Sequence, residues 1–261
     1  MEKDTALRVS ATEYVGRVSR QIGDGLPPRL GLGLRAWKNR SNLFGLHAPA
    51  SALVAWVPPG MAALDIGANR GLYAHWIAKR AAAVHAFEPN PAVYDYLARA
   101  AGKRVVAYNV ALSNANGVAT LWVPAGDGEA SLRQHDGPED ARPVQVEQRR
   151  LDDYHLDDIG FAKIDVEGHE WEVLQGGIET LRRWLPTLFV EMEERHRSGA
   201  VERVANFLQG LGYGHGFFMR QGQFHRIEEF DQEQDQLRHL PDVSSPDYVS
   251  NFLFPGRVAV G

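Results

Sequence analysis

A short segment that combines an acid with two glycines is the first candidate for ligand chemistry. Residues 65–71 read Asp-Ile-Gly-Ala-Asn-Arg-Gly and follow an apolar run that begins at Met61. Glycines in such a turn let the backbone bend tightly and approach a ligand closely. The three-glycine pattern that holds a pyrophosphate is not met, because Asn69 stands at the position of the second glycine. The carboxylate of Asp65 would also repel a pyrophosphate, so it favours a positively charged ligand.

A second acid stands where a nucleotide-binding sheet would place one. Glu88 follows the apolar run Ala83–Phe87. It comes roughly 20 residues after Asp65, the spacing at which an acid accepts hydrogen bonds from ribose hydroxyls. Asn90 is a supporting group beside it. S-adenosylmethionine combines a ribose with positive ammonium and sulfonium groups, so it fits this pair of acids. The competing interpretation is a plain strand-to-helix turn with a capping aspartate. The adenine edge is expected beside Asn109, Val110 and Ala111, which end the third apolar run.

Carboxylates and histidines gather in two later segments. Asp165 and Glu167 are two residues apart at the end of the apolar run Phe161–Val166, so their side chains leave a strand on the same face. His169 follows them at the expected start of a helix. The carboxyl ends of parallel strands meet at one edge of a sheet, so these groups are expected near the ligand of the first turn. The other segment, residues 186–196, contributes Glu191, Glu193 and His196.

This set of side chains suits methyl transfer to a hydroxyl. The hydroxyl must lose its proton, and a general base contributes about 10²–10⁴ in rate. Histidine has a suitable intrinsic pKa. His169 is the first candidate and His196 the second, although His169 at a helix start can instead satisfy local backbone groups. The alternative is Mg²⁺, which prefers carboxylate oxygens and would orient the acceptor. Its candidate ligands are Asp165, Glu191 and Glu193.

Alternating strand and helix patterns must position these groups. Such alternation predicts a doubly wound α/β fold, with a mostly parallel sheet and helices on both faces. Polar residues 124–143 are predicted to form a mobile loop on the acceptor side. Residues 1–60 are predicted as a helical and loop extension, and residues 61–261 as the main domain. Strands are expected at 61–66, 83–87, 105–110, 161–166 and 186–192, with β-like segments at 117–123 and 143–149. Further strands at 213–219, 223–227 and 248–254 are expected to be antiparallel, and helices are expected at 71–80, 92–101, from near Gly168, and at 200–210.

Composition narrows the class of protein. The 261 residues carry a net charge of −5 and no cysteine, which excludes disulfides, thiolate zinc sites and cysteine nucleophiles. The acidic balance argues against a general nucleic-acid binder. No apolar run approaches the roughly 18 residues that span a bilayer, and the start of the chain lacks the apolar core of a signal peptide. The expectation is a cytoplasmic protein without a transmembrane segment, and a homodimer is compatible with the sequence.

Five linked segments resemble the FkbM-type methyltransferases. They read DIGANRGLY at 65–73, FEPNP at 87–91, NVALS at 109–113, KIDVEGHEWEVLQG at 163–176 and FVEME at 189–193, and NFLFP at 251–255 is similar too. The resemblance covers most of residues 61–195 in the order and spacing of the family. Arg70 departs from it, since an apolar residue is more usual there, and the first 50 residues match nothing in it.

The resemblance implies a class I methyltransferase with a Rossmann-like, seven-stranded sheet and S-adenosylmethionine as cofactor. It implies that Asp165, Glu167, His169 and Glu191 lie on the acceptor side, with Asp165 joining the two histidines as a catalytic candidate. Ser131, in the predicted loop, is expected to contact the substrate with Glu167 and Glu191. The predicted cofactor contacts comprise Asp65, Gly67, Ala68, Asn69, Gly71, Tyr73, Glu88, Asn90, Asn109, Val110 and Ala111.

The resulting prediction is an O-methyltransferase that acts on a hydroxyl of a sugar, saccharide or glycosylated natural product. Three alternatives stay open: a methyltransferase for a peptide, protein or other metabolite, a non-catalytic S-adenosylmethionine-binding module, and a nicotinamide oxidoreductase. The Asn-Pro-Pro-Tyr type of signature for amino-nitrogen methylation is absent, because Asp165-Val-Glu167-Gly168 occupies that strand end.

Overall fold

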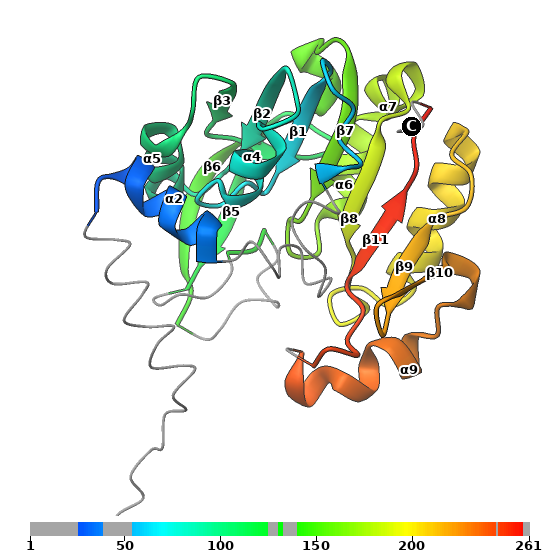
Figure 1. Ribbon diagram of the computed structural model, residues 1–261. Coiled ribbons are helices and arrows are strands. Elements are labelled where there is room, and N and C mark those ends of the chain that lie inside the picture. Colours follow the sequence, from blue (N-terminus) through cyan, green and yellow to red (C-terminus); the bar gives the residue numbers. More distant parts are fainter. Residues whose placement is uncertain (1–25, 39–53, 125–129, 133–139, 244, 258–261) are drawn as a thin grey trace, which may run out of the picture.

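A computed structural model describes residues 26–38, 54–124, 130–132, 140–243 and 245–257. Its main sheet has the strand order β10-β9-β11-β8-β7-β1-β2-β3 (Figure 1). The five strands from β8 to β3 run parallel to one another, and β11, β9 and β10 complete the sheet in antiparallel pairing. The strands are β1 Ala62–Ile66, β2 Ala83–Phe87, β3 Val105–Tyr108, β7 Ile159–Ile164, β8 Thr187–Glu191, β9 Phe217–Arg220, β10 Gln223–Arg226 and β11 Asn251–Phe254.

Eight strands form this sheet, one more than the seven that the family resemblance implied, and each overlaps one of the eight segments expected as its strands. Strand β10, in the predicted segment 223–227, folds back on β9 through the two residues Gln221 and Gly222. Both have positive φ, at 52° and 77°, as a tight two-residue hairpin requires. The predicted antiparallel pairing of the C-terminal strands is confirmed.

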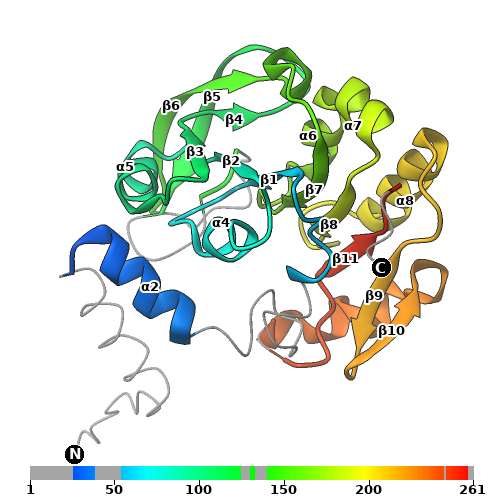
Figure 2. The ribbon, with the colours of Figure 1, turned by 45° about the horizontal axis from the view of Figure 1, so that its top comes forward.

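Helices cover both faces of the sheet, as predicted. Side chains alternate along each strand, so Leu64 and Ile66 of β1 join one apolar cluster while Ala63 joins the other. The first cluster packs against α6, α7 and α8, and the second packs against α4 and α5. Figure 2 shows α2 and α4 on the side of the sheet opposite α6 and α7. The helices are α2 Pro28–Lys38, α4 Leu72–Ile77, α5 Pro91–Ala100, α6 Glu170–Gly176, α7 Ile178–Trp184, α8 Ala200–Leu211 and α9 Gln232–Asp235.

The helix expected from near Gly168 is divided into α6 and α7 at Gly176 and Gly177. A Cβ on Gly176 would lie 1.9 Å from the carbonyl oxygen of Ser113, and a Cβ on Gly177 would lie 2.9 Å from Leu151. The two glycines therefore let the chain pass close to neighbouring segments at the point where the helix changes direction. Asn90 begins α5, where its side chain accepts a hydrogen bond from the backbone of Ala92.

A second sheet of three strands has the order β4-β6-β5. Strands β5 (Gly117–Val123) and β6 (Arg142–Arg149) confirm the two predicted β-like segments and pair antiparallel. The expected strand 105–110 instead ends at Tyr108, and a short strand β4 (Ala111–Leu112) leaves the main sheet to pair with β6. This sheet therefore lies beyond the carboxyl end of β3, where it forms part of the wall of the cavity described below.

Parts of two predicted segments lie outside the described residues. Of the N-terminal extension, the structure describes α2 and residues 54–60, and of the predicted loop 124–143 it describes residue 124, residues 130–132 and residues 140–143. In the described part of that loop, Ser131 and Trp122 exchange backbone hydrogen bonds. Among the described helices, none has the length and apolar character needed to cross a membrane.

Candidate functional site

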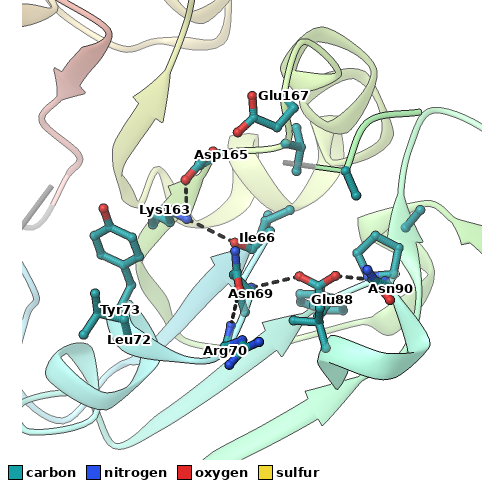
Figure 3. A pocket seen from close by; sticks show the side chains of 18 of the residues that line it. Ile66, Asn69, Arg70, Leu72, Tyr73, Glu88, Asn90, Lys163, Asp165 and Glu167 are labelled. Atoms are coloured by element: carbon teal, nitrogen blue, oxygen red, sulfur yellow. Dashed lines mark hydrogen bonds and ion pairs between the residues drawn. The ribbon is translucent and has the colours of Figure 1, made fainter. Parts of the chain in front are cut away.

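A cavity of about 750 Å³ opens at the carboxyl ends of β1, β2, β7 and β8 (Figure 3). Helix α2, the segment after β3 and strand β5 complete its walls. Ligands in doubly wound sheets bind at this edge, so the cavity is the candidate site. The predicted site residues that line it are Gly67, Ala68, Asn69, Tyr73, Glu88, Asn90, Val110, Ala111, Asp165, Glu167, His169 and Glu191.

The turn after β1 is built for close packing. Gly67 has φ +74°, and a Cβ there would lie 1.7 Å from the backbone oxygen of Asp165. Gly71 has φ +82°, and a Cβ there would lie 2.6 Å from Leu97. Asn69, which takes the place of the second glycine, has φ 48°, a left-handed conformation that asparagine tolerates better than most residues. Gly67 therefore lines the cavity with its backbone, whereas Gly71 packs against α5 and does not line it.

Glu88 stands at the end of β2 as a buried carboxylate that lines the cavity. One oxygen accepts a hydrogen bond from the backbone of Asn69 and the other from the backbone of Asn90, each at 2.8 Å. Burial raises the pKa of Glu88 to about 7, although these two hydrogen bonds oppose the shift. Asn109 does not line the cavity; its amide donates to the carbonyl oxygens of Glu88 and Pro89 and so holds this strand end in place.

Asp65 lies beneath the cavity and does not line it. Its side chain is fully buried, and its nearest charged partner is Lys163, with Nζ 3.8 Å from Oδ1. Burial raises the pKa of Asp65, and the positive charge of Lys163 opposes that shift. The sequence suggested that Asp65 contacts a cationic ligand directly. In the structure, Lys163 of the protein itself compensates the negative charge of Asp65.

Lys163 lies in the site although it was not among the residues predicted from the sequence. It lines the cavity floor, where its Nζ lies 2.9 Å from Asp165 and donates to the carbonyl oxygen of Gly67 at 3.1 Å. It also lies 4.4 Å from the centre of the Tyr73 ring. Burial lowers the pKa of Lys163, but Asp165 and Asp65 outweigh burial and raise it. The available signal was a lysine within the apolar run 159–164, two residues before Asp165 and on the same face.

The acids predicted for the acceptor side come from two neighbouring strands. Asp165 follows β7 and Glu191 ends β8, and both line the cavity. Ser250 donates a hydrogen bond to Glu191 at 2.9 Å. Burial raises the pKa of Glu191 well above its usual value, and the nearby Asp165 carboxylate raises it further.

The predicted magnesium site finds no support in the arrangement of its side chains. Across the residues that the structure describes, no group of three acidic or histidine side chains is arranged to hold a metal ion. Asp165 contacts Lys163, and Glu193 contacts Arg195 and His196. Glu193 does not line the cavity.

The two candidate histidines occupy different environments. His169 lines the cavity, with Nε2 2.9 Å from the hydroxyl of Ser113 and Nδ1 3.6 Å from Glu172. His196 lies outside the cavity, where its Nε2 is 3.2 Å from Glu193 and 3.5 Å from Glu167. Burial lowers the pKa of His196, but its hydrogen bonds with these two acids outweigh burial and raise it to about 9. At neutral pH His196 is therefore a cation, which leaves His169 as the better placed base.

Ser131 lies behind the turn that follows β7, and basic residues line the rim of the cavity. Ser131 is buried and does not line the cavity; its hydroxyl donates to the carbonyl oxygen of Glu167 at 3.1 Å. Three cations that were not among the predicted site residues line the cavity: Arg35, Lys38 and Arg70. Arg35, from α2, and Arg70, from the turn after β1, lie 5.7 and 5.3 Å from the ring centre of Tyr96. Helix α2 was outside every recognised motif, so only its packing against α4 and α5 reveals this contribution.

Fold and site together define a doubly wound α/β protein with a cavity at the carboxyl ends of its parallel strands, lined by the buried carboxylate of Glu88, by further carboxylates and by a histidine. Residues 65–214, more than half of the chain, match the family model described as the methyltransferase FkbM domain. The chain belongs to this family and is a methyltransferase. Because the chain belongs to a methyltransferase family, the alternative interpretation as a nicotinamide oxidoreductase is rejected.

Individual relatives agree with this assignment. The chain is 30% identical over 200 residues to 2-O-methyltransferase NoeI of Sinorhizobium fredii (strain NBRC 101917 / NGR234), a match that covers 64% of this chain and 78% of that protein. It is 29% identical over 199 residues to methyltransferase sdnD of Sordaria araneosa, covering 61% and 76%. The crystal structure of methyltransferase FkbM from Methylobacillus flagellatus KT superposes with a TM-score of 0.50 at 14% identity. That superposition covers 94% of this chain but 60% of the other, so this chain spans less than two thirds of that protein and the likeness supports the fold.

Proposed function

We propose that this protein is an S-adenosylmethionine-dependent O-methyltransferase whose acceptor is a hydroxyl of a sugar, saccharide or glycosylated natural product. One observation carries the proposal: a ribose-type acid, Glu88, and an acceptor-type set, Asp165, Glu167 and His169, line the same cavity. The relative named as a 2-O-methyltransferase supports oxygen as the atom that receives the methyl group.

The donor half of the cavity fits S-adenosylmethionine. Each oxygen of Glu88 accepts one backbone hydrogen bond, and a carboxylate oxygen has capacity for another, so both are available to ribose hydroxyls. Gly67 lines the cavity with its backbone, and the absence of a Cβ makes room for the backbone of Asp165 beside it. Val110 and Ala111 offer apolar surface for an adenine. S-adenosylmethionine, when bound, supplies an electrophilic methyl group. Asp65 supports this half through Lys163, which holds the carbonyl oxygen of Gly67.

The acceptor half binds and deprotonates the hydroxyl. Carboxylates such as Glu167 and Asp165 accept hydrogen bonds from sugar hydroxyls, and they align the reacting oxygen. Glu172 lies beside Nδ1 of His169, which favours the tautomer with the proton on Nδ1 and leaves Nε2 as the basic atom. Nε2 contacts Ser113, a buried residue that does not line the cavity, so the proposal requires the imidazole to exchange Ser113 for the acceptor hydroxyl. Asp165 is the second candidate base.

The direct test uses purified protein and a methyl-labelled donor. Isothermal titration with S-adenosylmethionine and with its demethylated product measures donor binding, and a panel of saccharides, glycosides, peptides and amines measures transfer. Label on a saccharide hydroxyl is the expected result. Transfer to amines or peptides alone would overturn the acceptor class. Donor binding without transfer to any acceptor would favour a non-catalytic binding module, and absence of donor binding would overturn the proposal altogether.

A further inference from the structure

The turn between β7 and α6 carries three of the acceptor-side candidates in five residues. Asp165, Glu167 and His169 all line the cavity, and Figure 3 shows Asp165 and Glu167 at its edge. The backbone of this turn is unusual, because Glu167 has φ 53° and Gly168 has φ 89°. A non-glycine residue in the left-handed region is strained. Such a conformation persists only where neighbouring groups hold it.

A single carboxylate oxygen stabilises this backbone conformation. Oε1 of Glu170 accepts a hydrogen bond from the backbone of Val166 at 3.2 Å and another from the backbone of Gly168 at 3.1 Å. Glu170 is the first residue of α6, and its side chain is buried. It therefore reaches back over the turn and binds the two amides that flank Glu167.

The helix that bears Glu170 is itself fixed to the core. Val173 and Leu174 of α6 are buried in the larger apolar cluster. A second tether comes from the other side, where Ser131 donates to the carbonyl oxygen of Glu167. The amides on both sides of Glu167 and its own carbonyl are thus all bonded, which determines where the Glu167 side chain points.

We propose that Glu170 is a positioning residue for the acceptor, which sets the shape of the turn 165–169 through one oxygen atom that accepts two backbone hydrogen bonds. This inference rests on the proposed function, because it assigns the turn to the acceptor. It concerns a residue that lies outside the cavity lining and acts through Glu167 and His169. Burial raises the pKa of Glu170 to about 7, and an acceptor oxygen is present in both the ionised and the neutral form.

Two variants of Glu170 test whether this acceptor oxygen is what matters. Glu170→Gln keeps a carbonyl oxygen in the same place, whereas Glu170→Leu has a similar volume and no acceptor. Glu179→Leu is the matched control, since Glu179 is an exposed glutamate in the first turn of the neighbouring helix α7. Ser131→Ala removes the second tether and tests the turn without touching the buried glutamate.

Two measurements separate positioning from general stability. Amide hydrogen exchange, followed by NMR, reports protection of the Val166 and Gly168 amides in the full-length chain with no acceptor present. Titration with the demethylated donor reports the donor half, and steady-state kinetics with a saccharide acceptor report KM and kcat.

Loss of protection at both amides is expected in Glu170→Leu, with donor affinity within about twofold of wild type. The kcat/KM for the acceptor is expected to fall by about 10²-fold, because a displacement of about 1 Å is enough for such a loss. Glu170→Gln is expected to restore protection and most of the activity, and Ser131→Ala to show a smaller loss. If Glu170→Leu keeps amide protection, or weakens donor binding as much as acceptor turnover, Glu170 is not a positioning residue. If Glu170→Leu does not fold, loss of activity in Glu170→Gln would overturn the inference. Wild-type protein that transfers no methyl to any saccharide would overturn the proposed function instead. The exchange measurement would still test, independently of any acceptor, whether Glu170 orders the turn.

Discussion

Replacing Glu88 by glutamine tests the donor site most directly. The two oxygens of Glu88 each accept one backbone hydrogen bond, from Asn69 and from Asn90. Glutamine has one oxygen and one amino group, so one of those two amides would face a donor in place of an acceptor. If Glu88 holds the ribose as proposed, the same substitution also takes a charged acceptor away from one ribose hydroxyl of the donor.

These contacts determine the expected change in the free energy of unfolding and the expected change in donor affinity. A buried backbone amide without an acceptor costs about 1–3 kcal/mol, which should appear as a lower free energy of unfolding in urea. A hydrogen bond to a charged group contributes about 1.5–3 kcal/mol, and each 1.4 kcal/mol is a factor of about ten in the dissociation constant. Glu88→Gln should therefore weaken the binding of S-adenosylmethionine by roughly 10- to 150-fold. Isothermal titration measures that change, and Glu202→Gln, an exposed glutamate on α8, is the control.

The pH dependence of binding provides a second readout of the same contact. The pKa of Glu88 is about 7 because burial raises it, and hydrogen bonds from ribose hydroxyls would favour the ionised form and lower that pKa. The donor should therefore bind more tightly as pH rises through about 7, with release of a proton below that value. Glu88→Gln should lose this dependence. Unchanged donor affinity in the variant, with the wild-type pH profile intact, would show that Glu88 does not hold the ribose.

Three other substitutions test the rest of the site. Gly67→Ala should lower the free energy of unfolding by about 2–5 kcal/mol in urea denaturation, because overpacking and left-handed strain add together. Gly102 has open space around it, so the control Gly102→Ala should change that free energy little. Equal losses in the two variants would contradict the close approach of Gly67 to Asp165. His169→Asn should keep donor affinity and lose about 10²-fold or more in kcat, and full turnover would transfer the role of base to Asp165. Lys163→Met leaves the buried Asp65 and the half-buried Asp165 without their cation, so the protein should lose about 3–5 kcal/mol of stability. A loss below about 1 kcal/mol by the same measurement would show that Lys163 does not compensate them.

Much of the fold was predictable because its signals are local. Apolar runs that stop at Gly67 and Glu88, with helical patterns between them, indicate parallel strands whose carboxyl ends share one edge, and the structure confirms this. The two β-like segments at 117–123 and 143–149 were also predicted correctly. The division of the strand expected at 105–110 was not, because the chain leaves the main sheet after Tyr108 to pair with β6, and that choice depends on a partner some forty residues away in the printed sequence.

The side-chain chemistry was predictable at the level of residue type and less so at the level of contact. Sequence spacing placed His169 and His196 near the same edge, but it does not say that Glu167 and Glu193 surround His196 while His169 faces the cavity. Nor does it reveal that Arg35 of α2 joins the cavity wall. Such contacts depend on the packing of distant segments, which a local pattern does not encode.

By itself, the sequence determined the turn after β1, the acid that ends β2 and the family to which the chain belongs, since each depends on a few residues in fixed order. Tertiary structure alone decided what Asp65 does. Strand β1 pairs with β7 in the register that sets Asp65 beside Lys163, so the charge of Asp65 is compensated within the sheet. The same lysine then holds Gly67 and Asp165. A buried carboxylate requires a partner charge or hydrogen bonds, and only the pairing of strands determines which residue supplies them.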